Sequence, residues 1–368
     1  MPAEASNNKP KIFVSDCEGP ISKNDNAFEL TSSFVPDGGS FFALISKYDD
    51  VLADVVKKPG YKAGDTLRLI LPFLKAYGAT DKKITDFSAR NVLLVPGAKD
   101  SLTFVRKLMP SFIVSTSYEQ YISSLCKLTG FPFENCYCTR LNLDKYAISV
   151  DETKRLRELQ REIAALPMIG IPKNADSVND FSEKDQTTIR RLDEIFWREL
   201  PTMESGKMLS EVNPVGGTEK AKAVLDIVER MGCSLDRVMY VGDSITDFPP
   251  LQLVRENGGL AVSFNGNDYS VRESDVAVLS GNTAATSVLA EAFSSNGKEG
   301  VFRLVEEWIP SGLKKSAVSP VLRERISLLF PYGLPQVERV TAENVERLKR
   351  ESNVFRKTVR GEAIGQLG

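Results

Sequence analysis

The stretch IFVSDCEGP, residues 12–20, decides how we expect this chain to fold. Its apolar start ends abruptly at Asp16, and a second acidic residue, Glu18, follows two positions later. A short apolar run that stops at acidic or small residues is typical of a buried strand in a parallel sheet. Gly19 allows a sharp turn after that strand, so that backbone amides can face an anion. Acidic turns are common, and taken alone the Asp-x-Glu-Gly stretch would be interpreted as a surface turn.

Four further runs of the same kind follow, and helical patterns lie between them. The expected strands are 112–114, 238–241, 260–264 and 275–279, and the expected helices are 99–109, 118–129, 220–231 and 247–256. This alternation predicts an α/β fold with a doubly wound parallel sheet. Ligands bind such sheets beyond the carboxyl ends of the strands. Those ends carry Asp16, Ser115 and Asp243, which we therefore expect to meet at one edge of the sheet.

The composition excludes several classes of function. Among 368 residues, 47 lysines and arginines nearly balance 49 aspartates and glutamates, which leaves a formal net charge of −2. This balance argues against the broad cationic surface that non-specific nucleic-acid binding uses. No run approaches the ~18 apolar residues of a membrane span, and residues 1–9 lack the apolar stretch of a signal peptide. We therefore expect a cytoplasmic protein that neither binds nucleic acid nor inserts into a membrane.

The absence of histidine narrows the chemistry further. It excludes Ser-His and Cys-His mechanisms and histidine-ligated metal sites. The five cysteines are scattered, and Cys136 and Cys138 form a C-x-C pair in a strand-like run, with no second pair at zinc-site spacing. We interpret both as buried or half-buried, reduced cysteines. The chemistry must then rest on carboxylates, hydroxyls, lysines and a hard metal ion.

Hydroxyl groups cluster at the second strand end. The sequence Ser-Thr-Ser at 115–117 precedes the helix expected from residue 118. Hydroxyls and free amides at the start of a helix can bind an anion. An ordinary helix N-cap explains the same residues, and by itself this second interpretation is the stronger one.

Acidic residues return at the third strand end, which reads GDSITD over residues 242–247. Asp243 and Asp247 stand at the end of the strand and the start of the following helix, where their carboxylates can contribute hard oxygen ligands to magnesium. The preceding helix begins at Lys220, whose ammonium group can reach a phosphate oxygen. Lys222 competes for this role, and either lysine could instead lie on a solvated helix face.

Together these elements resemble the haloacid dehalogenase superfamily, and most closely its phosphoserine-phosphatase-like branch. The order Asp-x-acid, hydroxyl, lysine, Gly-Asp-x-x-x-Asp carries the resemblance, and matching segments cover the predicted core. Further support comes from residues 258–265 and 275–278, and from a hairpin-like stretch at 137–148. The resemblance implies a magnesium-dependent phosphatase that acts on a small phosphomonoester.

The resemblance implies catalytic roles for two residues. Asp16 would attack phosphorus and form an aspartyl-phosphate, as carboxylate nucleophiles do. Glu18 would protonate the leaving alcohol and then activate water. Asp16 and the backbone carbonyl of Glu18 would also bind the magnesium ion. The family usually has aspartate at the second position, and the additional methylene of Glu18 moves the acid away from the backbone, so hydrolysis depends on how the protein accommodates it.

Other residues would bind the phosphate and the metal. By the same resemblance, Ser115 and Thr116 would hold phosphate oxygens, and Lys220 would neutralise charge on the nucleophile and the phosphoryl group. Asp243 would be a further magnesium ligand. Asp247 would support the metal or the lysine without contacting the substrate. Lys220 is preferred to its competitor because its distance to Asp243 along the sequence matches the phosphoserine-phosphatase pattern.

We expect the chain to divide into a core and three helical additions. The core comprises residues 1–20, 95–148 and 214–296, the cap 21–94, the insertion 149–213 and the C-terminal extension 297–368. By position, the cap would close over the site and select the substrate. The insertion and the extension exceed what the closest branch has, and they are candidates for a second lid or a surface for a protein partner.

The main alternative is a binding protein of the same fold. The core could serve as a non-catalytic scaffold, in which Glu18 marks lost or altered hydrolysis and the helical additions dock a partner. The overall architecture also resembles archaeal proteins named as accessory subunits of membrane hydrogenases. Other classes fit less well: a receiver domain is more compact, and a NAD-binding fold needs a Gly-x-Gly-x-x-Gly motif after its first strand.

Overall fold

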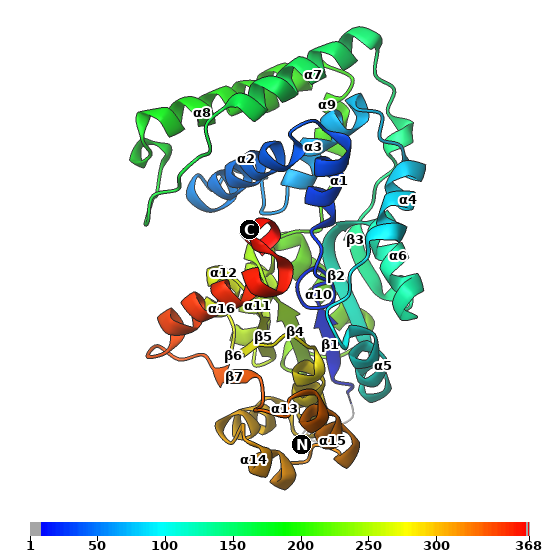
Figure 1. The fold of residues 1–368 in the computed structure, drawn as a ribbon, viewed down its shortest axis with the longest axis vertical. Helices are drawn as coiled ribbons and strands as arrows, with labels where there is room; N and C mark the ends of the chain where they lie inside the picture. The colour runs from blue at the N-terminus through cyan, green and yellow to red at the C-terminus, as the bar shows by residue number, and fades with distance from the viewer. Residues whose placement is uncertain (1–8, 366, 368) are drawn as a thin grey trace, which may run out of the picture.

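A seven-stranded sheet forms the centre of the molecule in the computed structural model, which describes residues 9–365 and 367 (Figure 1). The strands lie in the order β3-β2-β1-β4-β5-β6-β7, and neighbours pair in parallel except β7, which runs antiparallel to β6. Their bounds are β1 Ile12–Ser15, β2 Ser111–Tyr118, β3 Cys136–Thr139, β4 Val238–Gly242, β5 Leu260–Phe264, β6 Val276–Leu279 and β7 Gln336–Arg339. The expected α/β class with a doubly wound parallel sheet is therefore confirmed.

Helices cover both faces of this sheet. The core helices are α5 Ala98–Leu108, α6 Glu119–Thr129, α10 Thr218–Arg230, α11 Phe248–Glu256, α12 Asp268–Arg272 and α13 Ala284–Glu306. Ile12 and Val14 of β1 join a hydrophobic cluster with α10 and α11, whereas Phe13 joins another with α5 and α13. Successive side chains of a strand point to opposite faces, so a strand that is apolar throughout is buried on both. Within the described residues, no helix is long and apolar enough to cross a membrane.

The direction of winding reverses between β1 and β4, which are neighbours in the sheet although far apart in sequence. Ser15 of β1 is in register with Val241 of β4. On the other side of β1, the same residue is in register with Ile113 of β2. Ligands bind α/β sheets at such a reversal, beyond the carboxyl ends of the strands. The ends of β1, β2 and β4 therefore mark the place where a site is expected.

Helices from two separate segments form a second layer above these strand ends (Figure 1). The segment before β2 supplies α1 Asn26–Phe34, α2 Gly38–Asp50, α3 Thr66–Ala76 and α4 Asp81–Asn91, and the segment after β3 supplies α7 Val150–Ala165, α8 Glu183–Glu194 and α9 Gly206–Glu211. Buried side chains of both segments belong to one hydrophobic cluster. For example, the ring centroid of Phe73 lies 5.0 Å from that of Phe41 and 6.2 Å from that of Phe196. We call this layer, with its shared core, the cap layer.

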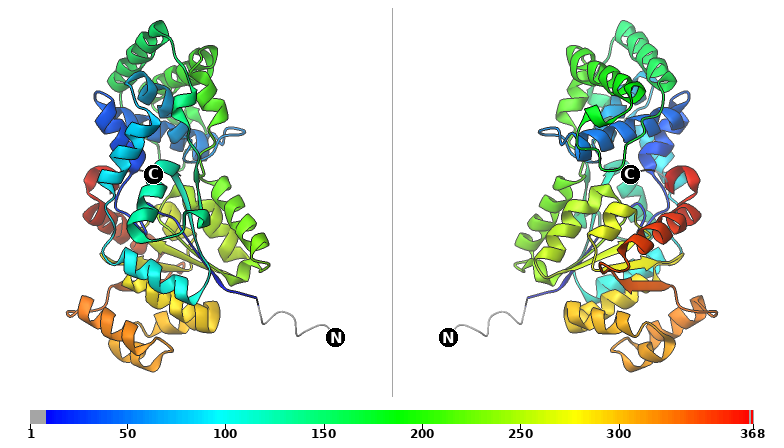
Figure 2. Two further views of the ribbon diagram at one scale, coloured as in Figure 1. Left: turned by 90° about the vertical axis from the view of Figure 1, so that its right-hand side faces the viewer. Right: turned by 90° about the vertical axis from the view of Figure 1, so that its left-hand side faces the viewer.

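The C-terminal part of the chain turns back along the core (Figure 2). It contains α14 Pro310–Lys315, α15 Pro320–Leu329, strand β7, α16 Val345–Arg360 and α17 Glu362–Gly365. Only helices were expected here, but β7 pairs with β6 and extends the sheet, with Gln336 opposite Leu279. On α16, Ser352 Oγ donates a 2.6 Å hydrogen bond to the backbone carbonyl of Gly266. The end of the chain thus returns to the edge of the sheet where the site is expected.

Two local expectations were wrong. The stretch at 137–148 forms no hairpin, because β3 pairs in parallel with β2 and is followed by the 3-10 turn Leu143–Lys145. The second strand continues to Tyr118 instead of ending at Val114, with a register shift against β3 between these two residues. Both differences have the same cause. The parallel pairing of β2 with β3, which is a tertiary contact, carries β2 on to Tyr118 and makes β3 part of the parallel sheet instead of a hairpin.

Candidate active site

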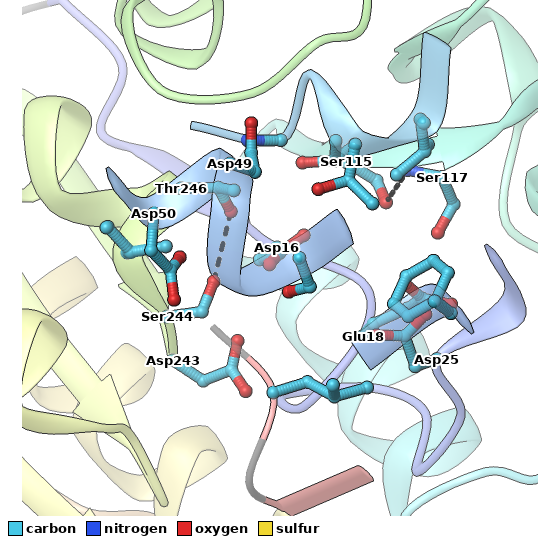
Figure 3. Close-up of a pocket in the computed structure, with 18 of the residues that line it drawn as sticks. Asp16, Glu18, Asp25, Asp49, Asp50, Ser115, Ser117, Asp243, Ser244 and Thr246 are labelled. Atoms are coloured by element: carbon cyan, nitrogen blue, oxygen red, sulfur yellow. Dashed lines mark hydrogen bonds between the residues drawn. The ribbon is translucent and has the colours of Figure 1, made fainter. Parts of the chain in front are cut away.

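Asp16 lies immediately beyond β1, at the point where the winding reverses. Its backbone N–H donates to the carbonyl of Val241 at 2.8 Å, so the residue continues the contact of β1 with β4. Its Oδ1 accepts a 2.6 Å hydrogen bond from the backbone N–H of Cys17, and only 4% of the residue is exposed. The carboxylate is thereby fixed in the wall of a pocket between the core and the cap layer (Figure 3).

One buried lysine serves two carboxylates here. Lys220, in the first turn of α10, places Nζ 2.8 Å from Asp16 Oδ2 and 2.8 Å from Asp247 Oδ1, and its side chain is fully buried. Lys222 has 70% of its side chain exposed and pairs with a neighbouring glutamate. Residues two apart on a helix point in different directions, so only Lys220 faces the pocket. We call Asp16, Lys220, Asp247 and Tyr240 the lysine cluster.

Asp247 is committed to contacts within its own loop and this cluster. Its Oδ2 accepts hydrogen bonds from the backbone N–H groups of Asp243 at 2.9 Å and Ser244 at 3.1 Å. Its Oδ1 accepts a 2.7 Å hydrogen bond from the hydroxyl of Tyr240 as well as the ammonium group of Lys220. Asp247 thus holds Lys220 and the loop after β4 in place.

The charges of the lysine cluster do not balance. Burial by itself raises the pKa of Asp247, but the ammonium group of Lys220 and the hydrogen bonds outweigh burial, so that this pKa lies below its ordinary value. Burial, and next the charge of Asp247, raise the pKa of Asp16 well above its ordinary value despite Lys220. A further cation beside Asp16 would therefore stabilise its ionised form.

Asp243 stands at the end of β4, close to the loop that follows β1. Gly19 in that loop has a φ of +106°, and a Cβ there would lie 2.1 Å from Asp243 Oδ2, so only glycine permits this approach. Asp16, Asp243 and Asp247 each offer one carboxylate oxygen within 4.8 Å of the others. Carboxylate oxygens are the ligands that Mg²⁺ prefers. The structure thus brings together the aspartates that follow β1 and β4.

Glu18 reaches from the loop after β1 to the start of α1 in the cap layer. Its Oε1 accepts a 2.7 Å hydrogen bond from the backbone N–H of Asn26. Burial, followed by the charge of nearby Asp25, raises the pKa of Glu18 well above its ordinary value. A raised pKa favours the protonated carboxyl group, the form that can donate a proton to a leaving group. The hydrogen bond from Asn26 directs the Glu18 side chain, which is one methylene longer than aspartate, toward the start of α1.

Hydroxyl residues of β2 line another side of the pocket (Figure 3). Ser115 Oγ accepts a 3.2 Å hydrogen bond from the backbone N–H of Ser117. The backbone carbonyl of Thr116 accepts a 2.5 Å hydrogen bond from Thr139, which holds the end of β2 against β3. The hydroxyl of Thr116 is buried and has no hydrogen-bond partner among the described residues. This hydroxyl is therefore available to an oxygen of a bound anion.

The cap layer faces the pocket with carboxylates. Asp25, Asp49 and Asp50 line it, together with the ring of Phe42. Asp49 Oδ2 accepts a 2.8 Å hydrogen bond from the backbone N–H of Gly64, and burial raises the pKa of Asp49 to about 7. The sequence did not single out these residues, since acidic residues in amphipathic helices are usually solvated.

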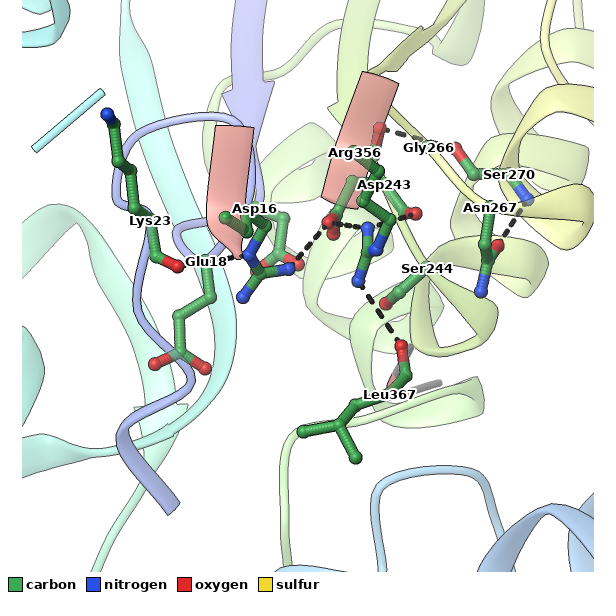
Figure 4. Close-up of polar contacts among 12 residues, drawn as sticks. Asp16, Glu18, Lys23, Asp243, Ser244, Gly266, Asn267, Ser270, Arg356 and Leu367 are labelled. Atoms are coloured by element: carbon green, nitrogen blue, oxygen red, sulfur yellow. Dashed lines mark hydrogen bonds and ion pairs between the residues drawn. The ribbon is translucent and has the colours of Figure 1, made fainter. Parts of the chain in front are cut away.

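Two arginines from α16 complete the pocket (Figure 4). Arg356 Nη1 donates to Asp243 Oδ2 and, at 3.0 Å, to the backbone carbonyl of Asp243. Arg360 Nη1 lies 3.0 Å from the same Oδ2, and this guanidinium group also donates to the backbone carbonyls of Lys23 and Asn24. The side chains of Arg356 and Arg360 are only 3% and 5% exposed. We call Asp243, Arg356 and Arg360 the arginine cluster.

Sequence reasoning missed the arginine cluster. Arg356 lies 113 positions after Asp243, in a helix that reads as polar and amphipathic. The one local signal is that Arg356 and Arg360 stand four residues apart and so share a helix face. That spacing is equally typical of a solvated face, and only the return of α16 to the sheet distinguishes the two.

Comparisons with known proteins support the fold over the whole chain. No protein-family model and no curated protein sequence matches it. Among solved structures, gene product AF1437 from Archaeoglobus fulgidus is similar with a TM-score of 0.79 at 28% sequence identity, over 98% of this chain and 99% of that chain. Phosphoserine phosphatase in its apo form gives a TM-score of 0.42 at 11% identity, over 75% of this chain and 97% of that chain. A phospho-aspartyl intermediate analogue of phosphoserine phosphatase gives 0.43 at 14% identity, over 73% and 93%. The likeness to AF1437 concerns the fold, so the function has to be inferred from the chemistry of the site.

Proposed function

We propose that this protein is a magnesium-dependent phosphohydrolase that cleaves a small phosphomonoester through an aspartyl-phosphate on Asp16. The observation that carries the proposal is the lysine cluster, in which a buried carboxylate lies 2.8 Å from a buried ammonium group at the reversal of the sheet. Asp243 stands beside it. Phosphoryl transfer depends mainly on positioning and on positive charge at the phosphoryl oxygens. The pocket offers a fixed nucleophile and the lysine that would stabilise this charge.

In the first step Asp16 would attack phosphorus. A carboxylate oxygen forms the new bond to phosphorus while the bond to the ester oxygen breaks. Lys220 would neutralise charge on the nucleophile and on the phosphoryl group. Thr116 would donate its hydroxyl, which has no partner among the described residues, to a phosphoryl oxygen. Ser115, on the same strand, would also hold a phosphoryl oxygen.

Glu18 would carry the proton in both steps. Burial and the charge of Asp25 favour its protonated form, so it can give a proton to the leaving alcohol. The deprotonated carboxylate would then accept a proton from the water that attacks the aspartyl-phosphate. This second step releases inorganic phosphate and restores Asp16 and the protonated Glu18.

The residues of the pocket fit a magnesium ion. Asp16, Asp243 and the backbone carbonyl of Glu18 would hold it, and Asp247 would support the site through Lys220. The fit is indicated by the hard oxygen donors and by the raised pKa of Asp16, whose charge Lys220 does not fully compensate. When bound, the ion would supply positive charge that offsets the repulsion between nucleophile and phosphate.

The proposal is tested by release of inorganic phosphate from a panel of phosphomonoesters with Mg²⁺. The wild type should turn over at least one of them, and Asp16→Asn should turn over none. Beryllofluoride with Mg²⁺, a phosphoryl mimic, should raise the Tm of the wild type and leave that of Asp16→Asn unchanged. Unchanged hydrolysis by Asp16→Asn would refute the mechanism.

Glu18 can be tested separately from the nucleophile. Glu18→Gln removes the acid while keeping the backbone carbonyl, so turnover should fall by about 10²- to 10⁴-fold with metal binding retained. Glu18→Asp should keep turnover. Lys220→Ala should lose far more activity than its matched neighbour Lys222→Ala, because only the first lysine faces the pocket. Equal, small losses at both lysines would mean that neither contacts phosphate.

One observation favours a second candidate function, a non-catalytic binding protein. Two guanidinium groups already bind Oδ2 of Asp243, so positive charge is present there without a metal ion. In that case the core would be a scaffold, and the helical additions would dock a protein partner, as in an accessory subunit of a larger complex. A wild type that binds Mg²⁺ but releases no phosphate from any ester of a broad panel would favour the scaffold.

A further inference from the structure

The end of α16 and the proposed magnesium site share a single carboxylate. Both guanidinium groups of the arginine cluster bind Oδ2 of Asp243, and Arg356 also binds the backbone carbonyl of that residue (Figure 4). Asp243 is only 1% exposed. A helix from the far end of the chain is thus tied directly to the centre of the pocket.

The first part of α16 is docked independently of this contact. Ser352 Oγ donates to the carbonyl of Gly266, and Asn353 Nδ2 donates to Asp268 Oδ1, both at 2.6 Å. Leu348 is fully buried in a cluster with residues of β6. The last turn of α16 is held by Arg360, which donates to Asp243 and also to the backbone carbonyls of Lys23 and Asn24. The contacts of the helix end thus depend mainly on Arg356 and Arg360, whereas those of its beginning do not.

The two guanidinium groups of the arginine cluster are buried close to each other. Two guanidinium groups share one carboxylate oxygen, and Nε of Arg356 is buried without a partner among the described residues. Buried like charges destabilise each other unless each has its own counter-charge. A divalent cation brought to the same carboxylate would add a third positive group at this point. A cation bound to Asp243 would therefore repel both guanidinium groups and weaken their contact with this carboxylate.

We propose that the C-terminal helix and a divalent cation compete for Asp243, so that the arginine cluster acts as a latch that metal binding opens. The proposal rests on the magnesium site of the proposed function. When the cation takes Asp243, Arg356 and Arg360 release it, and the end of α16 loosens. Because Leu367 beyond α17 also lines the pocket, the same release removes a side chain from the space a substrate would enter.

Competition of this kind is reciprocal. If the latch lowers the affinity for the cation by some factor, the cation lowers the stability of the docked helix end by the same factor. The coupling can therefore be measured from either side, through metal affinity or through the mobility of the helix end. Neither measurement requires turnover.

The first experiment measures Mn²⁺ and Mg²⁺ binding by calorimetry, without substrate. The double variant Arg356→Met/Arg360→Met should bind the cation more tightly than the wild type, by about 5- to 150-fold, the usual range of coupling between two ligands. Arg350→Met is the matched control, because Arg350 is an exposed arginine on the same helix and its loss should leave the Kd unchanged. Equal affinities of the wild type and the double variant would overturn the latch. Weaker binding by the double variant would also overturn it, because the arginines would then position Asp243 for the metal.

The second experiment needs no arginine variant and therefore does not depend on one folding. Hydrogen exchange of the wild type is compared with and without Mg²⁺. Backbone amides of residues 357–365 should exchange faster with the cation, whereas those of residues 348–353 should not change. Asp243→Asn should show fast exchange at 357–365 in both conditions. Exchange at 357–365 that is unchanged or slowed by Mg²⁺ in the wild type contradicts the latch.

These outcomes separate the latch from the proposed function. If the wild type hydrolyses a phosphomonoester with Mg²⁺ but binds the cation as tightly as the double variant, the latch is refuted. The proposed phosphatase function is then unaffected. If neither form binds Mg²⁺ or Mn²⁺, the magnesium site and the competition for it are both refuted.

Discussion

The lysine cluster and the arginine cluster lie next to each other beyond β1 and β4, and they distribute charge in opposite ways. In the lysine cluster, one ammonium group serves two carboxylates, at 2.8 Å from each. In the arginine cluster, two guanidinium groups serve one carboxylate. The first has an excess of negative charge and the second an excess of positive charge. The two clusters come closest at Asp16 and Asp243, whose carboxylate oxygens lie within 4.8 Å of each other.

The two clusters also differ in how they are built. The lysine cluster consists of core residues whose loops are fixed by backbone hydrogen bonds, such as those that Asp247 accepts from the two residues after β4. The arginine cluster depends on side chains of a helix near the end of the chain. We infer that the lysine cluster belongs to the folded core, while the arginine cluster is a contact that can open. Substitutions in the two clusters should therefore have graded effects.

The largest effect is expected from removing the lysine that serves two carboxylates. Lys220→Met leaves Asp16 and Asp247 buried without a cation, and breaking a buried ion pair in this way costs about 3–5 kcal/mol of unfolding free energy. Lys222→Met, in the same helix, removes only an exposed pair and should cost at most about 1 kcal/mol. Urea unfolding of both variants measures the difference. Similar, small losses would show that Lys220 is not the cation on which the core depends.

A carboxylate without any cation partner offers the next test of the comparison. Asp49 makes no ion pair with the described residues, and burial raises its pKa from 3.8 to about 7. Between these pH values the folded protein holds a proton that the unfolded chain lacks, so the stability contributed by protonated Asp49 is present below pH 4 and is lost as pH rises to 7.

Asp49→Asn removes this dependence while keeping an acceptor for the N–H of Gly64. Its unfolding free energy relative to the wild type should rise between pH 4 and 7, by up to about 4 kcal/mol. Asp151→Asn is the control, because that side chain is 96% exposed and its loss should give no such trend. A difference between Asp49→Asn and wild type that stays constant over this pH range contradicts the assignment of a buried, unpaired acid.

A smaller effect is expected in the arginine cluster, because Asp243 has two cation partners. Arg356→Met leaves Arg360 on the carboxylate, so the loss should be about 2 kcal/mol, the contribution of hydrogen bonds to a charged group. Arg350→Met should be neutral. Unfolding free energies measured with a chelator present, so that no metal stabilises the folded state, test this order. A loss as large as that of Lys220→Met would mean that the arginine cluster is part of the core and cannot open as a latch.

The smallest effect is expected at the edge of the lysine cluster. Tyr240→Phe removes the 2.7 Å hydrogen bond from the buried hydroxyl to Asp247 and leaves the ion pair with Lys220 intact. Because Lys220 stays on the same oxygen, the cost should be about 1.5 kcal/mol, at the low end for a hydrogen bond to a charged group. Thermal and urea unfolding both measure it, and a stabilising change would indicate that the hydroxyl is not donating to Asp247. The expected order of losses in unfolding free energy, from Lys220→Met to Tyr240→Phe, would then need a different physical explanation.

The core of the fold and part of the candidate site were readable from the sequence because their signals are local. Short apolar runs gave the bounds 12–15 and 260–264, which are those of β1 and β5. Asp16 and Asp243 directly follow such runs, and parallel strands place their carboxyl ends on one edge. Lys220 could be preferred to Lys222 only by its distance along the sequence to Asp243. Their spacing on the helix already implied that one of the two side chains points away from the site.

The tertiary structure alone decided the packing of the cap layer, the strand β7 and the arginine cluster. Residues before β2 and after β3 share one hydrophobic cluster, although nothing local relates them. Arg356 and Arg360 have the spacing of an ordinary solvated helix face, and their burial depends on α16 returning to β4 across more than a hundred residues. Periodicity and strand-end motifs are properties of neighbouring residues, so they fix which elements form and which side chains share a face. Contacts between distant segments depend on how the packed elements meet, and this decides which carboxylate receives which cation.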